Sequence, residues 1–284
     1  MKPKISRYPI EVFGHVYNDK TDKAKEDWKN QFCPYLKREC TKPRKSEPHI
    51  KVGICSLGYQ GSFLENFEPV IICPFRFLEK VVFDSIHDKF FPDWDNYAWV
   101  KEVNMGVSGN VDYVAVKVDS SRKEPLDFFC VEFQASGTTG SPYPYVKDLM
   151  KYGCYKNNYT YGINWANEFM KTMMQQVYKK GQVVETWNKK IVFVIQDVAL
   201  KYLENAVDTS DLRYNIDDVI HFMTYKLQWD ETQKRFVLVL SRWVSTDLNG
   251  INKILAGANS EQYLTESDFL KNAFRKGLED GIFK

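Results

Sequence analysis

The middle of the chain shows the clearest alternation of apolar and polar positions. Three β-rich runs cover residues 99–105, 111–118 and 128–134, with the turn-forming segments VSGN and SSRKEPLD between them. This pattern predicts an antiparallel meander. The preceding segment, RFLEKVVFDSIHDKF at 76–90, repeats its apolar residues near the helical period and predicts a helix.

A second set of elements is predicted downstream. A helical pattern over 164–188 leads into the apolar run IVFVIQD at 191–197, which is typical of a buried strand. A helix followed by such a strand indicates a crossover connection onto the same sheet. Residues 219–227 and 236–244 predict a β-pair, and residues 261–278 predict a terminal helix.

Two segments lack a clear period. Residues 37–51 are polar and broken by proline, with six Lys or Arg against two Glu, and predict a basic loop and not a helix. Residues 135–161 are rich in Gly, Ser, Pro, Tyr and Lys, and predict an irregular excursion on the surface. Loops of this length are often functional.

The length and charge of the chain exclude few classes of protein. The 284 residues allow a catalytic core with a small appended module. We expect the module over residues 1–75 and the core over residues 76–284. Lys and Arg total 39 against 37 Asp and Glu, so any affinity for a polyanion must come from local patches. The first eight residues are charged and no stretch approaches 18 uncharged apolar residues, which predicts a soluble, intracellular protein without a membrane partner.

Acidic and amide side chains interrupt the predicted meander. They are Glu102, Asp112, Glu132 and Gln134. Glu132 and Gln134 are two residues apart, so on a strand both point to the same face. Oxygen ligands of this kind suit Mg²⁺, which can activate a water and neutralise charge on a phosphate. A single acid in a strand is more often a solvent-facing residue, but the combination favours a metal site because buried charges are costly unless paired or metal-bound.

Four of the six cysteines lie in the N-terminal quarter of the chain. They are Cys33, Cys40, Cys55 and Cys73, with six, fourteen and seventeen residues between them. In a reducing compartment they are poor candidates for disulfides. Four thiolates can close a tetrahedral site for zinc or iron, which is structural coordination. The spacing lacks paired CxxC knuckles, so free buried thiols remain an equal alternative.

Several segments together resemble the NotI-type restriction endonucleases. They are YPIEVFGHVY, CPYLKRECTKPRK and VGICSLGY, followed by FLEKVVFD, GNVDYVAV and CVEFQASG. The resemblance covers about residues 8–200. It implies a four-cysteine iron module before a PD-(D/E)xK nuclease core, an α/β (α+β) fold with a mixed sheet flanked by helices. Val111 stands where this motif usually has proline and Gln134 where it usually has lysine, although some restriction enzymes of the superfamily use Glu-x-Gln.

The resemblance also assigns roles to the residues of the meander. Asp112 and Glu132 would bind magnesium together with the Phe133 carbonyl, Gln134 would position the attacking water, and Glu102 would be a fourth member. Because glutamine is not a base, the proton would pass to a metal-bound hydroxide, a phosphate or bulk water. The resemblance further implies a type II enzyme of the prokaryotic cytoplasm. It would be a homodimer that cuts double-stranded DNA at a short, GC-rich palindrome, with a companion DNA methyltransferase for the same site.

Basic residues of the two irregular segments are candidates for DNA contacts. Arg44 and Lys45 are expected to contact backbone phosphates, which would make binding salt-dependent. Lys147 and Lys151 accompany several tyrosines in the second segment and are suited to phosphates and base edges. A loop packed by its own aromatic side chains is an equal alternative for that second segment.

Two other functions fit part of the pattern. The first is a non-enzymatic DNA-binding or assembly protein with a structural zinc-type site, in which the acids are ordinary polar residues of a sheet. A DNA-cleavage assay with magnesium separates it from an endonuclease. The second, electron transfer at a rubredoxin-like iron, is disfavoured because the usual CxxC knuckles are absent.

Overall fold

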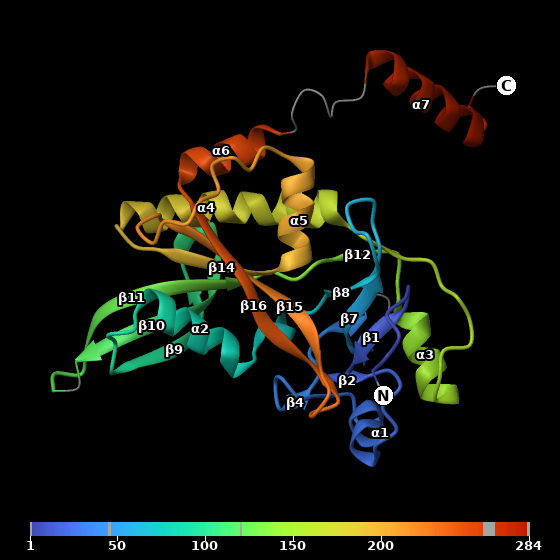
Figure 1. Cartoon of the computed structure of the whole chain (residues 1–284), viewed down its shortest axis with the longest axis horizontal. Coiled ribbons are helices and arrows are strands. Elements are labelled where there is room, and N and C mark those ends of the chain that lie inside the picture. The colour runs from blue at the N-terminus through green and yellow to red at the C-terminus, as the bar shows by residue number, and fades with distance from the viewer. Residues whose placement is uncertain (1, 45–46, 120, 258–264, 283–284) are drawn as a thin grey trace.

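A six-stranded mixed sheet forms the centre of the molecule (Figure 1). The computed structural model describes residues 2–44, 47–119, 121–257 and 265–282. The sheet has the order β16-β15-β14-β11-β10-β9. Its strands are β9 (Tyr97–Asn104), β10 (Asn110–Asp119), β11 (Glu124–Phe133), β14 (Ile191–Gln196), β15 (Ile220–Asp230) and β16 (Arg235–Thr246).

The connections of this sheet match the sequence pattern. Strands β9, β10 and β11 form the predicted antiparallel meander. After a long connection, β14 pairs with β11 in parallel, which confirms the predicted crossover. β15 adds in parallel to β14, and β16 returns antiparallel to β15 as the predicted β-pair.

Helices cover both faces of the sheet. The π-helix η3 (Trp165–Met173) continues into α4 (Met174–Thr186), and together they occupy the predicted helical stretch. With α5 (Asp197–Ala206) and α6 (Leu248–Ala256), they lie on one face and share its apolar core. Helix α2 (Lys80–Phe90) packs on the opposite face. The fold is therefore a mixed α and β architecture with helices on either side of a mixed sheet, as the sequence predicts.

A second, smaller sheet is built from the N-terminal part of the chain. It has the order β2 (His15–Val16), β1 (Pro9–Val12), β7 (Ile54–Tyr59) and β8 (Glu68–Ile71). Helix α1 (Asp22–Lys29) and a short ribbon of β3 (Phe32–Cys33) and β4 (Arg38–Glu39) follow β2. Another ribbon pairs β5 (Pro43–Arg44) with β6 (Glu47–Lys51), so the described part of the predicted basic loop contains no helix.

A buried arginine joins the two sheets. Arg76 is fully buried, and its Nε lies 3.2 Å from the carboxylate of Glu11 on β1. It also pairs with Glu79 and donates to the Phe236 carbonyl of β16 at 2.9 Å. Ser56 of β7 donates to Glu11 at 2.7 Å. The network holds the small sheet against the end of the β15–β16 hairpin.

Two predicted elements differ from the structure. The helix predicted over 76–90 begins at Lys80, because the 3₁₀ turn η1 (Pro74–Phe77) places Arg76 in the buried network. The excursion predicted over 135–161 is wrong in part, since α3 (Tyr143–Tyr152) lies within it, between the short strands β12 (Thr138–Thr139) and β13 (Gly162–Ile163). Tyr143 and Tyr145 lie on the buried face of α3, and Gly153 ends the helix in the left-handed conformation typical of a helix C-terminus.

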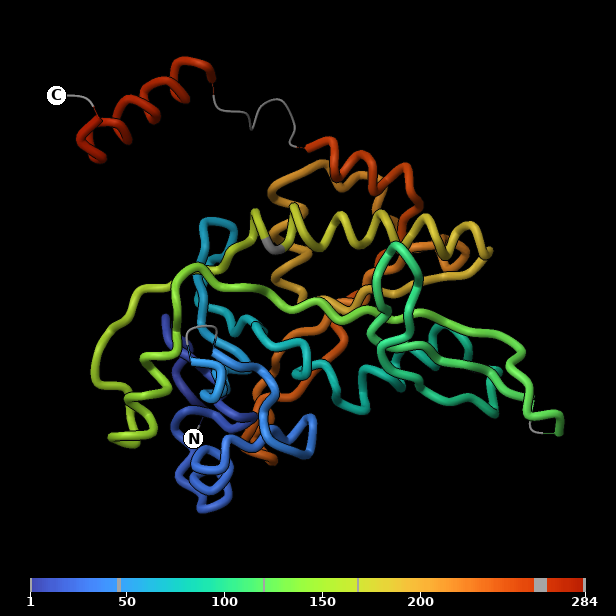
Figure 2. Tube along the Cα trace, turned by 180° about the vertical axis from the view of Figure 1, so that it is seen from behind, coloured from blue at the N-terminus to red at the C-terminus, as the bar shows by residue number. Residues whose placement is uncertain are grey.

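The C-terminal helix is also confirmed. Helix α7 (Glu266–Glu279) covers most of the predicted range, whereas residues 261–264 of that prediction lie outside the described residues. Figure 2 shows α7 set apart from the two sheets. Among the helices of the described ranges, none has the length and apolar character needed to cross a bilayer.

A buried histidine makes the stability of this fold sensitive to pH. His221 on β15 is fully buried, packs against the tilted ring of Phe90 with ring centroids 4.7 Å apart, and accepts a hydrogen bond from Trp243 at 3.2 Å. Burial, with a smaller contribution from the charge of Lys190, lowers its pKa from 6.5 to about 3. The neutral imidazole therefore stabilises the fold above pH 6.5, and this contribution is lost as the pH falls toward 3.

Replacing the histidine should remove part of this dependence. We expect His221→Phe to flatten the loss of stability below pH 6.5 by up to about 1.4 kcal/mol per pH unit, the value for one proton. Urea unfolding of both proteins between pH 7 and pH 4 measures the difference. Equal slopes would show that other groups take up the proton.

Candidate active site

Asp112 and Glu132 face each other across β10 and β11. The register pairs Tyr113 with Val131, and one further step places Asp112 opposite Glu132. The backbone N–H of Phe133 donates to Asp112 Oδ2 at 2.8 Å, and the N–H of Asp112 lies 3.3 Å from Glu132 Oε2. The strand pairing therefore brings together the two acids predicted from the sequence.

Glu102 lies next to this pair in a strained backbone conformation. Its φ of 52° is in the left-handed region, which is uncommon for a residue other than glycine. β9 pairs with β10 at the positions before and after it, so Glu102 lies opposite Asp112. Strain of this kind costs about 1–3 kcal/mol and often occurs at functional sites. The structure thus adds the third predicted acid to the pair.

A lysine that the sequence analysis missed completes the cluster. Lys180 of α4 donates from Nζ to Glu132 Oε1 at 2.5 Å and to the Asn110 carbonyl at 2.7 Å. Its position in the sequence carried a signal, because Lys180 lies on the stripe of apolar residues that α4 buries, between Val177 and Val184. The partner could not have been found from the sequence, since Glu132 is 48 residues away.

The pKa values of the two acids reflect how closely they are packed. Burial raises the pKa of Asp112 and the charge of Glu102 adds to the rise, while the hydrogen bond from Phe133 and the charge of Lys180 oppose it. Burial also raises the pKa of Glu132, with a further rise from Asp112 and an opposing effect of Lys180. Burial and mutual repulsion therefore disfavour the doubly ionised pair, and a bound cation would relieve both.

Gln134 is less closely tied to the acids. It follows the last residue of β11, and its backbone N–H donates to the Val194 carbonyl at 2.9 Å. Its side-chain amide lies 3.2 Å from the Ala135 carbonyl. The contacts found in the described ranges do not join Gln134 to Asp112 or Glu132, so it borders the cluster.

A cavity of about 400 Å³ lies beside two of the three acids. Glu102 and Asp112 line it together with Lys101 of β9. Its opposite wall comes from the cysteine-containing part of the chain and includes Arg38 and Thr41. The N-terminal segment therefore borders the candidate active site directly.

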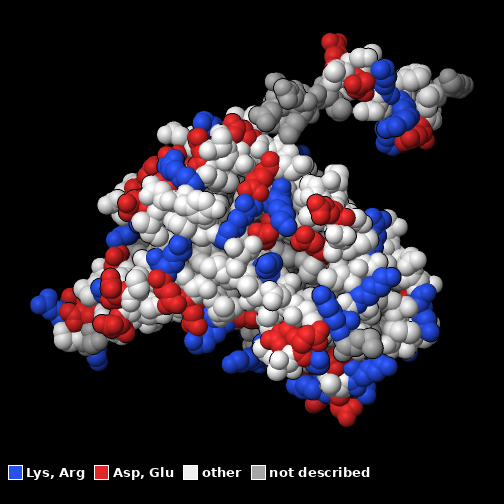
Figure 3. Space-filling model, in the orientation of Figure 1, with Lys and Arg blue, Asp and Glu red and all other residues white. Residues whose placement is uncertain are grey.

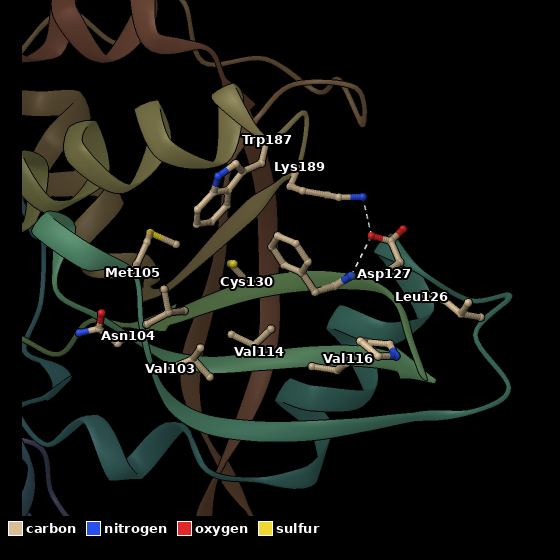
Figure 4. A pocket seen from close by; sticks show the side chains of 13 residues that line it. Val103, Asn104, Met105, Val114, Val116, Leu126, Asp127, Cys130, Trp187 and Lys189 are labelled. Carbon is tan, nitrogen blue, oxygen red and sulfur yellow. Dashed lines mark hydrogen bonds and ion pairs between the residues drawn. The ribbon is translucent and has the colours of Figure 1, made fainter. Parts of the chain in front are cut away.

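A second cavity on the same sheet has a different character. It measures about 480 Å³ and lies between the meander and the C-terminal end of α4, as Figure 4 shows. Apolar side chains such as Val114, Cys130 and Trp187 line most of it, and the charged residues at its rim, Lys189 and Asp127, pair with each other at 2.5 Å. This cavity offers no set of acids for a metal ion.

The four cysteines of the predicted metal module are buried free thiols. Burial raises the pKa of Cys55 well above its usual value, and the nearby Cys73 and Cys33 add to the rise. Burial likewise raises the pKa of Cys73 to about 11, with smaller contributions from Cys40 and Cys33. The thiols are thus neighbours. Within the part of the chain that the structure describes, however, no three His, Cys, Asp or Glu side chains are arranged to hold a metal ion, so the metal site stays a prediction.

Comparison with protein families identifies the chain. The model of a family described as restriction endonuclease NotI matches residues 15–238, a range that includes the four cysteines, the three acids and Lys180. The chain belongs to the NotI restriction endonuclease family. No curated protein matches it. The family identifies the protein as a type II restriction endonuclease, a hydrolase acting on double-stranded DNA, and rules against the non-enzymatic alternative.

The basic residues predicted to bind DNA in this NotI-family enzyme lie partly together. Arg44 stacks over the ring of Tyr143 at 4.9 Å and pairs with Glu47, and Lys147 of α3 lies 5.7 Å from the same ring. The two irregular segments therefore meet at Tyr143. Lys151 follows one helical turn after Lys147.

Their surroundings are mixed in charge. Lys45 lies outside the described residues. On the face drawn in Figure 3, basic and acidic side chains are interspersed, as the balanced charge of the NotI-family chain predicts. Tyr145 is buried and its hydroxyl donates to the Arg7 carbonyl at 3.0 Å, so packing by aromatic side chains explains at least part of this segment.

Proposed function

We propose that this NotI-family enzyme is a magnesium-dependent endonuclease with a PD-(D/E)xK core, and that it hydrolyses DNA at a short, GC-rich palindrome. The observation that carries the proposal is the pairing of Asp112 with Glu132 across β10 and β11, beside the strained Glu102. The sheet around them, a meander followed by a parallel crossover strand, has the element order expected for that core.

The residues fit a hard divalent cation. Asp112 and Glu132 are neighbouring buried carboxylates whose charges repel each other, and the charge of Glu102 also reaches Asp112. Carboxylate oxygens are ligands that magnesium prefers, so the pair of Asp112 and Glu132 suits this ion. Asp112 and Glu132 would hold the ion with the Phe133 carbonyl, and Glu102 would add a carboxylate. A bound magnesium supplies Lewis acidity and charge neutralisation for phosphodiester hydrolysis.

Other groups of the protein would orient the acid, the attacking water and the DNA. The Phe133 N–H fixes Asp112 in its orientation. Gln134, at the border of the cluster, would orient the attacking water but cannot remove its proton, because an amide is not a base. Arg44, Lys45, Lys147 and Lys151 would hold the DNA through its phosphates.

The palindromic site implies a symmetric assembly. A homodimer whose two-fold axis coincides with that of the DNA would cut both strands with two copies of the site. Such an enzyme acts in the prokaryotic cytoplasm, where a companion methyltransferase would protect the same sequence in the host DNA.

The cleavage assay tests the proposal directly. Purified protein is incubated with long, unmethylated DNA of mixed sequence in the presence of magnesium, and the new ends are sequenced. We expect ends that share one short palindrome, and no cutting in a chelator. Random ends, or cutting that does not need a divalent ion, would contradict the proposal.

A structural metal on Cys33, Cys40, Cys55 and Cys73 is the second part of the proposal. The four thiols are buried neighbours, and backbone hydrogen bonds that favour a thiolate reach Cys33, Cys55 and Cys73. The module would span residues 1–75 and precede a nuclease core with a C-terminal extension over 76–284. Zinc and iron both suit four thiolates.

Metal analysis should find about one tightly held zinc or iron per chain. Cys55→Ser should release the ion and destabilise the N-terminal sheet, because the metal would supply folding free energy to that region. Cys154→Ser is the matched control, since Cys154 is exposed and lies outside the cluster. A wild-type protein that is fully folded and free of metal would exclude the module.

A further inference from the structure

One lysine is buried in the apolar side of a helix at the candidate active site. Lys180 belongs to the face of α4 that packs on the sheet, and its side chain is only 4% exposed. Burying an ammonium group is costly unless it is paired, and an apolar side chain of similar size would stabilise such a position at least as well. The position of Lys180 therefore calls for a role connected with its partner.

The contacts of Lys180 tie the two acid-bearing strands together. The ammonium binds Glu132 on β11 and the Asn110 carbonyl on β10, two residues before Asp112. It engages Oε1 of Glu132, whereas Oε2 faces the Asp112 backbone. One carboxylate oxygen thus binds the lysine, and the other lies 3.3 Å from the backbone N–H of Asp112.

Lys180 also brings a positive charge to Glu132. Position 134, two residues after Glu132, carries the neutral Gln134. Among the described residues, Glu132 forms its ion pair with Lys180, and no ion pair is found for Asp112. A positive charge therefore reaches the pair from a helix and not from the strand that carries Glu132.

We propose that Lys180 is a positioning residue for the nuclease reaction. By holding Oε1, it fixes the orientation of the Glu132 carboxylate, whose other oxygen would be left to help hold the ion. This inference rests on the proposed magnesium-dependent function. Its physical basis is that a carboxylate with one oxygen fixed by a buried donor cannot rotate away from its metal-binding orientation.

Lys180→Met tests the role with two readouts that should move in opposite directions. Cleavage at saturating magnesium should fall about 10- to 100-fold, the usual loss when a residue that orients a metal ligand is removed. Calcium binding to the DNA-free protein, measured by calorimetry, should tighten by roughly threefold or more, because a cation beside the incoming ion has been removed. Lys179→Met is the matched control, since Lys179 is exposed and should change neither quantity.

A second variant keeps the test decisive if Lys180→Met does not fold. Lys180→Gln can still donate a hydrogen bond to Glu132 without a charge, so it should recover much of the cleavage that Lys180→Met loses, while calcium binding tightens as it does in Lys180→Met. A parallel loss of cleavage, calcium binding and thermal stability would mean that Lys180 is only structural, and would overturn the proposal. Wild-type cleavage and calcium binding in the variants would overturn it too.

The same experiment separates this inference from the proposed function. If the wild-type protein cuts no DNA, the proposed function fails. The calcium-binding comparison still decides whether Lys180 acts on the ion site, because it does not depend on turnover.

Discussion

Asp112→Asn should abolish DNA cleavage while specific binding of DNA in calcium remains measurable. The variant keeps the size of the side chain and an oxygen that can accept the Phe133 N–H bond, but removes the negative charge next to Glu132. Loss of the metal's charge stabilisation is worth several kcal/mol, so we expect cleavage to fall by about a thousandfold or more. Glu132→Ala should have a similar effect on cleavage.

Two further variants sharpen this result. Gln134→Ala should slow cleavage less completely, because it removes a positioning contact and leaves the charges around the ion in place. Asp119→Asn is the control on the same strand, since Asp119 binds the backbone and hydroxyl of Ser121 in a surface turn. Time courses on plasmid DNA measure the cleavage rate of each variant, and binding assays in calcium measure its affinity for DNA. Cleavage by Asp112→Asn at the wild-type rate would show that the active site lies elsewhere.

Arg76→Met should be the most destabilising of the substitutions considered, at about 3–5 kcal/mol. Methionine fills a similar volume but leaves the Glu11 carboxylate buried without its counter-ion and the Phe236 carbonyl without a donor. A typical domain is stable by about 5–15 kcal/mol, so the loss is a large share of the total. Urea unfolding with unchanged m-values measures it.

The control variant lies four residues away. Lys80→Met removes an exposed lysine that pairs with Asp84 on the surface, and should cost less than about 1 kcal/mol. The double variant Arg76→Met with Glu11→Gln should recover part of the loss, because it no longer buries a charged carboxylate. If Arg76→Met is as stable as Lys80→Met, the buried pairs contribute nothing to holding the two sheets together.

Much of the sheet could be predicted because its strands alternate or are continuously apolar. The meander, the crossover to β14 and the hairpin of β15 and β16 follow from patterns that a short window contains. Helix α3 could not be predicted in this way, because its buried side mixes two tyrosines and an aspartate with Val146 and Leu149, and its flanks are rich in Gly and Pro. Its packing is decided by partners far away in the chain, such as the Arg7 carbonyl that binds Tyr145.

The candidate site, like the fold, could be predicted from the sequence only in part. Asp112 and Glu132 stood out in the sequence because acids are rare inside apolar strands, and strand pairing then placed them opposite each other. Glu102 was recognised as an acid, but its left-handed backbone was not, since no glycine or asparagine marks that position. Lys180 was missed because a helix pattern describes the face on which a residue lies and not the acid that it meets.

The arginine that joins the two sheets also affects when the protein can finish folding. Its acceptor on Phe236 lies 160 residues further along the chain, so the N-terminal sheet leaves the ribosome long before this hydrogen bond can form. Contacts of such large sequence separation form slowly and late. A growing chain therefore carries a guanidinium that is not yet fully bound until β16 has been synthesised. For an enzyme that cuts DNA, this order delays completion of the fold until the last strand of the central sheet has emerged.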